Sequence, residues 1–105
     1  MPLFTLPITP DLEAWSQSTE LDGRVFRLDF DWSRREQAWY LDIFGSDGTP
    51  LAIGLKLCEN VNVLRREVST LLPPGPLVVL DTTGAHEEPT LEGLGGRWVV
   101  FYGSP

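Results

Sequence analysis

Apolar and polar residues alternate along the middle of the chain, and this alternation is the clearest structural signal in the sequence. Apolar side chains recur at every second position through 26–32, 39–43 and 51–57. A period of two is typical of β-strands that bury one face and expose the other. The pattern therefore predicts three consecutive antiparallel strands.

Turn residues separate these strands and suggest a fourth. Asp-Gly pairs stand at 22–23 and 47–48, and tight hairpin turns need the positive φ angles that glycine adopts at little cost. The first pair predicts that 15–21 folds back on the strand that starts at Arg24. A further edge strand is expected at Leu3–Ile8, where proline is tolerated because one side of an edge strand makes no ladder bonds.

The second half of the chain is less regular. Residues 60–72 fit either a helical stripe or a continued period of two, and a turn or short helix is the favoured interpretation. The prolines within 73–76 end that segment. Leu77–Leu80 is then expected to form a short buried strand, 81–96 a surface loop and Arg97–Tyr102 the closing strand.

These elements predict one single domain over 1–105. It comprises a meander over 3–57, a turn or short helix over 58–76, and closing strands with a loop over 77–103. About seven short strands with at most one short helix indicate an all-β fold, either a single-domain antiparallel sandwich or a small barrel. A chain of 105 residues is an ordinary length for one such core.

Charge and composition narrow the possible partners. Eight basic side chains against fifteen acidic ones give a formal net charge of -7, which repels phosphate groups and argues against nucleic acid. The apolar runs are much shorter than the roughly 18–20 residues that a membrane span requires. The single cysteine, Cys58, cannot form an internal disulfide and has no metal-binding cluster around it.

Several acidic residues suggest catalysis but are better explained structurally. Asp29, Asp31 and Asp42 are expected on the solvent face of a hairpin, where carboxylates lack the desolvation that makes one of them an acid catalyst. His86 is interpreted as an exposed loop histidine. No residue is predicted to be catalytic, to bind a cofactor or to bind a metal.

The segment Asp81-Thr82-Thr83-Gly84 resembles the Asp-Thr-Gly turn of retroviral aspartic proteases, which are also β-rich chains that work as dimers. An extra threonine separates the aspartate from the glycine. That insertion displaces the carboxylate from the geometry in which two aspartates share a proton. A loop leaving a strand is the favoured interpretation.

Aromatic and basic residues supply candidates for protein contacts. Alternation places Trp32 and Trp39 in the core, whereas Tyr40 and Phe44 point outward from the same hairpin. Large apolar side chains opposite a core suggest a protein interface. Tyr40, Phe44 and the basic pair Arg65-Arg66 are therefore interface candidates.

Short segments in a characteristic order and spacing run through most of the chain. They are Leu21-Asp22-Gly23, Trp39–Ile43, Asp47–Leu51, Gly54-Leu55, Val63–Arg66, Pro89-Thr90, Leu94-Gly95 and Val99–Tyr102. Together they resemble the small baseplate plug proteins of contractile-tailed phages, of which the best-known member comes from a cyanophage. The resemblance covers about Leu3 to Tyr102.

The resemblance implies a non-enzymatic structural protein of the virion, packed at the centre of the tail baseplate after assembly in the host cytoplasm. Its implied partners are baseplate hub and tail-tube proteins and symmetry-related copies of itself, without a cofactor. Edge strands at Leu3–Ile8 or Arg97–Tyr102 would then be candidates for pairing with neighbours. Two alternatives stay open: a stand-alone ligand-binding β module, for example for carbohydrate, and an aspartic-protease-like dimer acting through Asp81.

Overall fold

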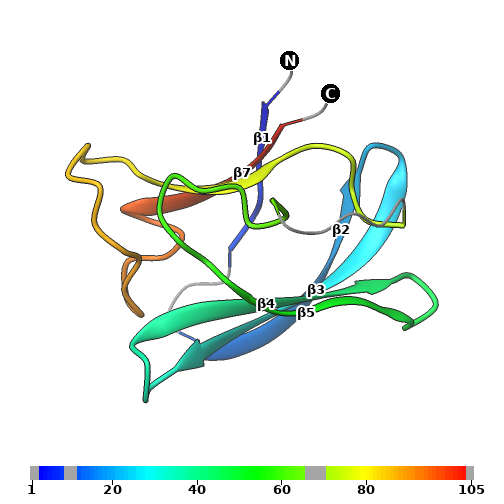
Figure 1. Ribbon diagram of the computed structural model, residues 1–105, viewed down its shortest axis with the longest axis horizontal. Helices are drawn as coiled ribbons and strands as arrows, with labels where there is room; N and C mark the ends of the chain where they lie inside the picture. The colour runs from blue at the N-terminus through cyan, green and yellow to red at the C-terminus, as the bar shows by residue number, and fades with distance from the viewer. Residues whose placement is uncertain (1–2, 9–11, 66–70, 104–105) are drawn as a thin grey trace.

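The computed structural model describes residues 3–8, 12–65 and 71–103. Within them the chain forms seven strands in two antiparallel sheets and no helix. The strands are β1 (Leu3–Thr5), β2 (Ala14–Leu21), β3 (Arg24–Ser33), β4 (Ala38–Gly45), β5 (Pro50–Lys56), β6 (Leu77–Asp81) and β7 (Trp98–Gly103). The sheets lie as two layers (Figure 1). The predicted all-β sandwich is confirmed.

The four-stranded sheet is the meander that the alternation predicts, in the order β2-β3-β4-β5. Both residues of the turn between β2 and β3 have positive φ, 52° for Asp22 and 80° for Gly23. Leu28, Leu41 and Ile43 are completely buried, so the apolar positions do share the inner face.

The three-stranded sheet differs from the prediction in its connections. Its order is β1-β7-β6, and β1 pairs with β7 from the opposite end of the chain, so the two ends lie side by side (Figure 1). The meander expected from residue 3 therefore begins only at Ala14. The expectation that Arg97–Tyr102 forms an edge is wrong, because β7 is bonded on both sides. Alternation reports which face of a strand is buried but not which strand lies beside it.

The segment between β5 and β6 forms turns and isolated bridges along the edge of β6, not a short helix, over the described residues 58–65 and 71–76. The Asn62 side chain accepts hydrogen bonds from the N–H groups of Leu64 (3.0 Å) and Leu77 (3.1 Å). Such side-chain bonds compete with helical ones. The rest of the helical stripe, 66–70, lies outside the described residues.

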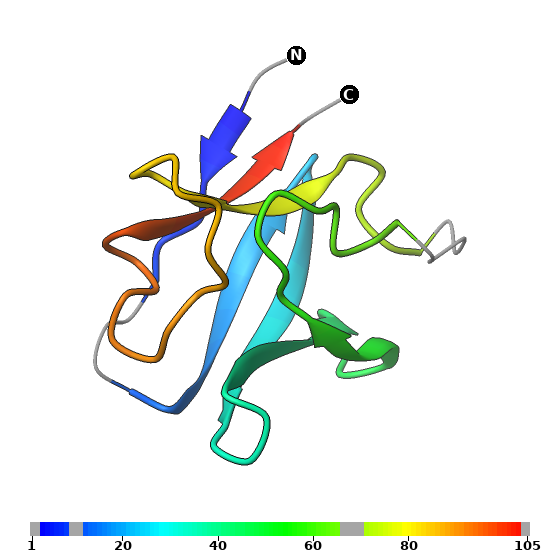
Figure 2. The same cartoon turned by 60° about the vertical axis from the view of Figure 1, so that its left-hand side comes forward.

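One core joins the two sheets. Its cluster of buried side chains includes Trp39 from one sheet and Val79, Val100 and Tyr102 from the other. Trp15 stacks on Phe30 with ring centroids 4.8 Å apart and extends this core to the edge of the four-stranded sheet. The long connection from β6 to β7 runs along one side of the sandwich (Figure 2).

Candidate interaction surfaces

Tyr40 and Phe44 lie on the outer face of β4, as predicted, but their rings are half-buried. The guanidinium carbon of Arg27 lies 4.0 Å from the centroid of the Phe44 ring. The Tyr40 hydroxyl donates a 2.6 Å hydrogen bond to Glu36, which raises the pKa of Tyr40. Arg27 of β3 thus covers part of the Phe44 ring, and Glu36 of the β3–β4 turn holds the Tyr40 hydroxyl.

The aspartates of this face serve the sheet itself. Asp42 accepts a 2.7 Å hydrogen bond from the N–H of Gly54, at an irregularity between β4 and β5. Asp29 pairs with Arg27 at 3.2 Å, and Asp31 is exposed. The predicted solvated acidic face is confirmed.

The outer surface of the three-stranded sheet is mostly apolar. Its outward residues carry no charge in the described strands: Leu3, Thr5, Val78, Leu80, Val99 and Phe101. Leu3 is 65% exposed, and with Val78 and Phe101 it lines a shallow cavity of about 180 Å³. Sequence reasoning missed this surface. The sequence signal for this surface is the uninterrupted apolar runs at 77–80 and 98–102. A strand with one solvated face would instead alternate apolar and polar residues.

Arg65 lies in the segment beside β6 and is exposed. Its guanidinium donates a 3.3 Å hydrogen bond to the carbonyl of Asn62 in its own turn. The structure therefore does not bring Arg65 together with Tyr40 and Phe44, which lie on the other sheet. Arg66 lies outside the described residues.

Asp81, at the end of β6, is buried and fully hydrogen-bonded. Arg97 binds it through two nitrogens at 2.9 and 2.8 Å. The N–H and hydroxyl of Thr83 and the N–H of Glu87 also donate to it. These donors, with Arg97 first, hold the pKa of Asp81 well below its ordinary value.

This environment is incompatible with an aspartic-protease dyad. Such a dyad needs a carboxylate that shares a proton with its counterpart, whereas Asp81 is held ionised by an arginine of its own chain. The alternative of a protease-like dimer acting through Asp81 has no geometric support. Asp81 fixes the loop that follows it.

His86 is exposed, as predicted, and its Nδ1 lies 3.0 Å from an oxygen of Glu59, whose side chain is buried. The other oxygen of Glu59 accepts the N–H of Asp81. Within the described residues, no group of three or more histidine, cysteine or acidic side chains is placed to hold a metal ion.

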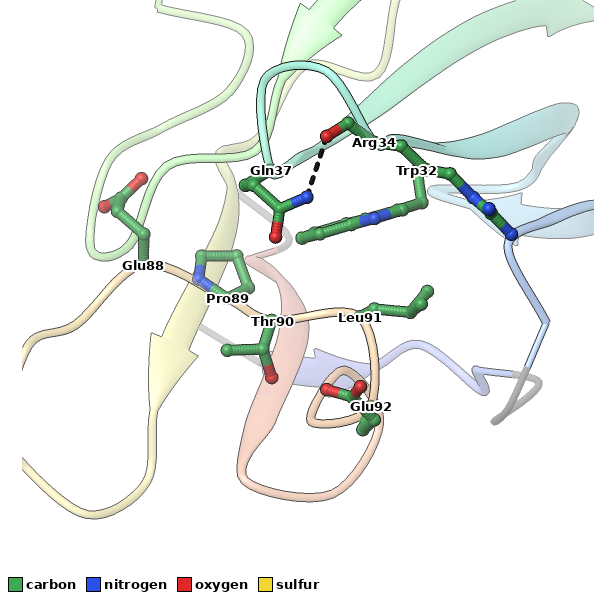
Figure 3. Close-up of a pocket in the computed structure, with 8 residues that line it drawn as sticks. All are labelled: Trp32, Arg34, Gln37, Glu88, Pro89, Thr90, Leu91 and Glu92. Carbon is green, nitrogen blue, oxygen red and sulfur yellow. Dashed lines mark hydrogen bonds between the residues drawn. The ribbon is translucent and has the colours of Figure 1, made fainter.

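A cavity of about 420 Å³ lies between the β3–β4 turn and the loop at 88–92 (Figure 3). The ring of Trp32 forms one wall and faces Pro89, Thr90 and Leu91 across the opening. Trp32 is only 9% exposed, which leaves little ring surface for stacking a sugar. This aromatic ring is therefore a weak platform for carbohydrate.

The charges around this cavity also disfavour an anionic ligand. Its one arginine, Arg34, is bound at 2.7 and 2.5 Å to the carboxylate of Glu13. Glu88 and Glu92 add negative charge to the lining. Of the uncharged polar lining groups, the amide of Gln37 donates to the carbonyl of Arg34 at 2.7 Å, and the hydroxyl of Thr90 accepts the N–H of Gly93 at 3.1 Å.

No helix within the described ranges has the length and apolar character needed to cross a membrane. A comparison with curated proteins finds no match. The family model described as "Cyanophage baseplate Pam3 plug gp18" matches residues 3–105, which is nearly the whole chain. On this match, the chain belongs to the cyanophage baseplate plug family.

Proposed function

We propose that this chain is a non-enzymatic hub plug of a contractile-tail baseplate, which binds its neighbours through surface contacts. The observation that carries the proposal is the family match over residues 3–105. A family of baseplate plugs gives the chain a structural role in the baseplate. The finer statements, that it plugs the hub and has no catalytic activity, are ours.

The two sheets support a role based on fit. One offers an uncharged apolar outer face and the other an acidic face with half-buried aromatic rings. The free-energy cost of removing water is lower for uncharged surface than for charged surface, which favours its burial in a protein interface. We propose baseplate hub and tail-tube proteins, and copies of the chain itself, as the partners, joined during assembly in the host cytoplasm.

Within this role, Tyr40, Phe44, Arg65 and Arg66 remain our proposed contact residues. Tyr40 and Phe44 each keep part of their ring accessible, and Arg65 is exposed. Since Arg65 lies in the segment beside β6 and the two aromatic residues lie on β4, we propose that they touch different neighbours. The carbohydrate-binding alternative has less support, because Arg27 lies against the Phe44 ring and the side chains of Tyr40 and Phe44 are both half-buried.

Deletion of the gene followed by complementation tests this function. Particles purified after complementation should contain the chain in a fixed ratio to tail proteins, and deletion should abolish intact tails. Complementation with Phe44→Ser should restore fewer intact tails than complementation with Ser46→Ala, a matched change in the nearby turn. Intact, infectious tails made without the chain would contradict the proposal.

A further inference from the structure

Strand β2 leaves one of its backbone edges open. The N–H of Trp32 donates a 2.7 Å bond to the carbonyl of Glu13, and the register then directs the odd-numbered residues of β2 toward β3. Ala14, Ser16, Ser18 and Glu20 therefore point their N–H and C=O groups away from the sheet. Those groups have no other backbone partner in the described part of the chain, and all four residues are exposed.

The other three sheet edges are shorter, covered or irregular. The edge of β6 is bonded by the N–H groups of Asn60 and Val63 at 2.7 and 2.8 Å. Strand β1 has three residues and is soon followed by Pro7, which has no N–H. Strand β5 shifts register against β4 and contains Gly54 at a φ of 72°. Among the described strands, β2 is thus the long edge with regular pairing.

The side chains along this edge allow another strand to approach. Natural proteins protect edges with lysine, proline or bulges, but β2 has small residues at Ala14, Ser16 and Ser18 and a charge only toward one end, at Glu20. Trp15 is half-exposed beside this edge. A neighbouring strand would cover more of its ring, which adds apolar burial to the backbone bonds.

We propose that β2 pairs antiparallel with β2 of a second copy around a two-fold axis at Gln17. The outward N–H and C=O groups belong to even-numbered residues, so even-numbered residues of the two copies must lie opposite each other. With the axis at Gln17, Ser16 lies opposite Ser18 of the second copy, and Ala14 lies opposite Glu20 of the second copy. No like charges meet directly, and an isologous pair is self-complementary by symmetry. The pairing joins two four-stranded sheets into one. Its biological context rests on the proposed function in baseplate assembly.

The net charge of -7 on each copy opposes this pairing at long range. Salt screens such repulsion over about 10 Å at 0.1 M, while the backbone bonds are unaffected. The pairing should therefore strengthen when salt is added.

Sedimentation equilibrium of the full chain tests the proposal at low and at high salt. The wild-type chain should form dimers whose dissociation constant falls as salt rises. Ser16→Pro removes an outward N–H without touching a bond to β3, so two symmetric bonds are lost and dimerisation should weaken about tenfold or more. The matched control Ser16→Ala keeps the amide and should dimerise like wild type.

Two double variants test the register and do not depend on proline. Ser16→Lys with Ser18→Lys places like charges opposite each other across the axis and should weaken the dimer about tenfold. Ser16→Lys with Ser18→Asp places opposite charges there and should restore or strengthen it. Within one chain, Ser16→Lys of the second variant faces Asp29 on β3, and Ser18→Asp faces Arg27 there. Both pairs have opposite charges, so this variant favours the fold.

A monomer at all concentrations and salt levels would overturn the pairing, as would an oligomer that the proline and charge variants leave unchanged. Near-ultraviolet circular dichroism shows whether each variant keeps its fold. Particle composition separates this inference from the proposed function. A chain present in baseplates but monomeric in solution refutes the pairing alone, whereas a dimer absent from particles refutes the function alone.

Discussion

The buried carboxylate of Asp81 organises the junction of β6, β7 and the loop between them. Its partners Thr83, Glu87 and Arg97 come from both ends of that loop. The sequence predicts a loop after Asp81 but does not predict that Asp81 anchors it. Arg97 lies sixteen residues away, and no local pattern links it to Asp81. By contrast, the inward positions of Trp32 and Trp39 follow directly from alternation.

Asp81→Asn should destabilise the fold clearly, because Arg97 then loses the buried one of its two carboxylate partners and keeps only the exposed Glu87. Chemical denaturation followed by tryptophan fluorescence measures the change. Asp29→Asn is the matched control, since its pair with Arg27 is more exposed and exposed pairs contribute about 0–1 kcal/mol. Equal effects of the two substitutions would contradict the structural role of Asp81.

The same carboxylate makes part of the stability depend on acid pH. The folded state lowers the pKa of Asp81, so its contribution is present above the ordinary pKa of about 3.9 and is lost as pH falls toward the folded value. In the wild-type chain, the denaturant concentration at the midpoint of unfolding should decrease as the pH is lowered below 4. In Asp81→Asn this decline should be shallower, and an identical decline would argue against the assignment.

Tyr102 is another buried residue whose polar group makes long-range contacts. Its hydroxyl donates to Asp22, in the β2–β3 turn, and accepts the N–H of Gly75 at 2.9 Å. Burial first, and then the bond to Asp22, raise the pKa of Tyr102 to about 12. The hydroxyl therefore ties both sheets and the 71–76 segment together in its neutral form.

Tyr102→Phe should cost about 1–3 kcal/mol of unfolding free energy, because the buried N–H of Gly75 and the carboxylate of Asp22 each lose their hydrogen bond to the hydroxyl. A raised folded pKa means that stability is intact below the ordinary pKa near 10 and is lost as pH rises from 10 to 12. Denaturation of wild type and variant at pH 8 and pH 11 measures both effects. A difference between the two proteins that is no smaller at pH 11 would contradict this assignment.

At the scale of elements, the meander could be predicted because it is local. Each pair from β2 to β5 is adjacent in sequence, and Asp22-Gly23 and Asp47-Gly48 mark two of its turns. The pairing of β1 with β7 joins residues about a hundred positions apart and leaves no periodic trace. The apolar outer face was missed because runs such as Leu77–Leu80 were interpreted as buried on both sides.

The 71–76 segment crosses the end of β7 so closely that Gly75 has no room for a side chain. A Cβ atom there would lie 1.8 Å from the carbonyl oxygen of Gly103. Gly75→Ala should therefore cost about 1–3 kcal/mol, as overpacking does, measured by thermal unfolding. Gly96→Ala is the control, because its nearest neighbour would be 3.7 Å from the new Cβ; similar losses in both would contradict the close crossing.

At the scale of the whole molecule, neither sheet can bury its apolar face alone. The inner faces of β3 and β4 pack against side chains of β6 and β7 in one cluster. The chain was predicted to be a single domain, and that prediction requires cooperative folding, since a two-state domain loses all its structure together.

The chain of 105 residues should therefore unfold in one transition, with a free energy of about 5–15 kcal/mol and coincident curves by far-ultraviolet circular dichroism and tryptophan fluorescence. A fragment spanning 12–57 keeps the complete meander but loses the layer that covers Leu28, Leu41 and Ile43. It should be unfolded or aggregated, because an isolated antiparallel sheet with an exposed apolar face has nothing to bury it against. A soluble, cooperatively folded fragment would show instead that the two sheets are separate folding units.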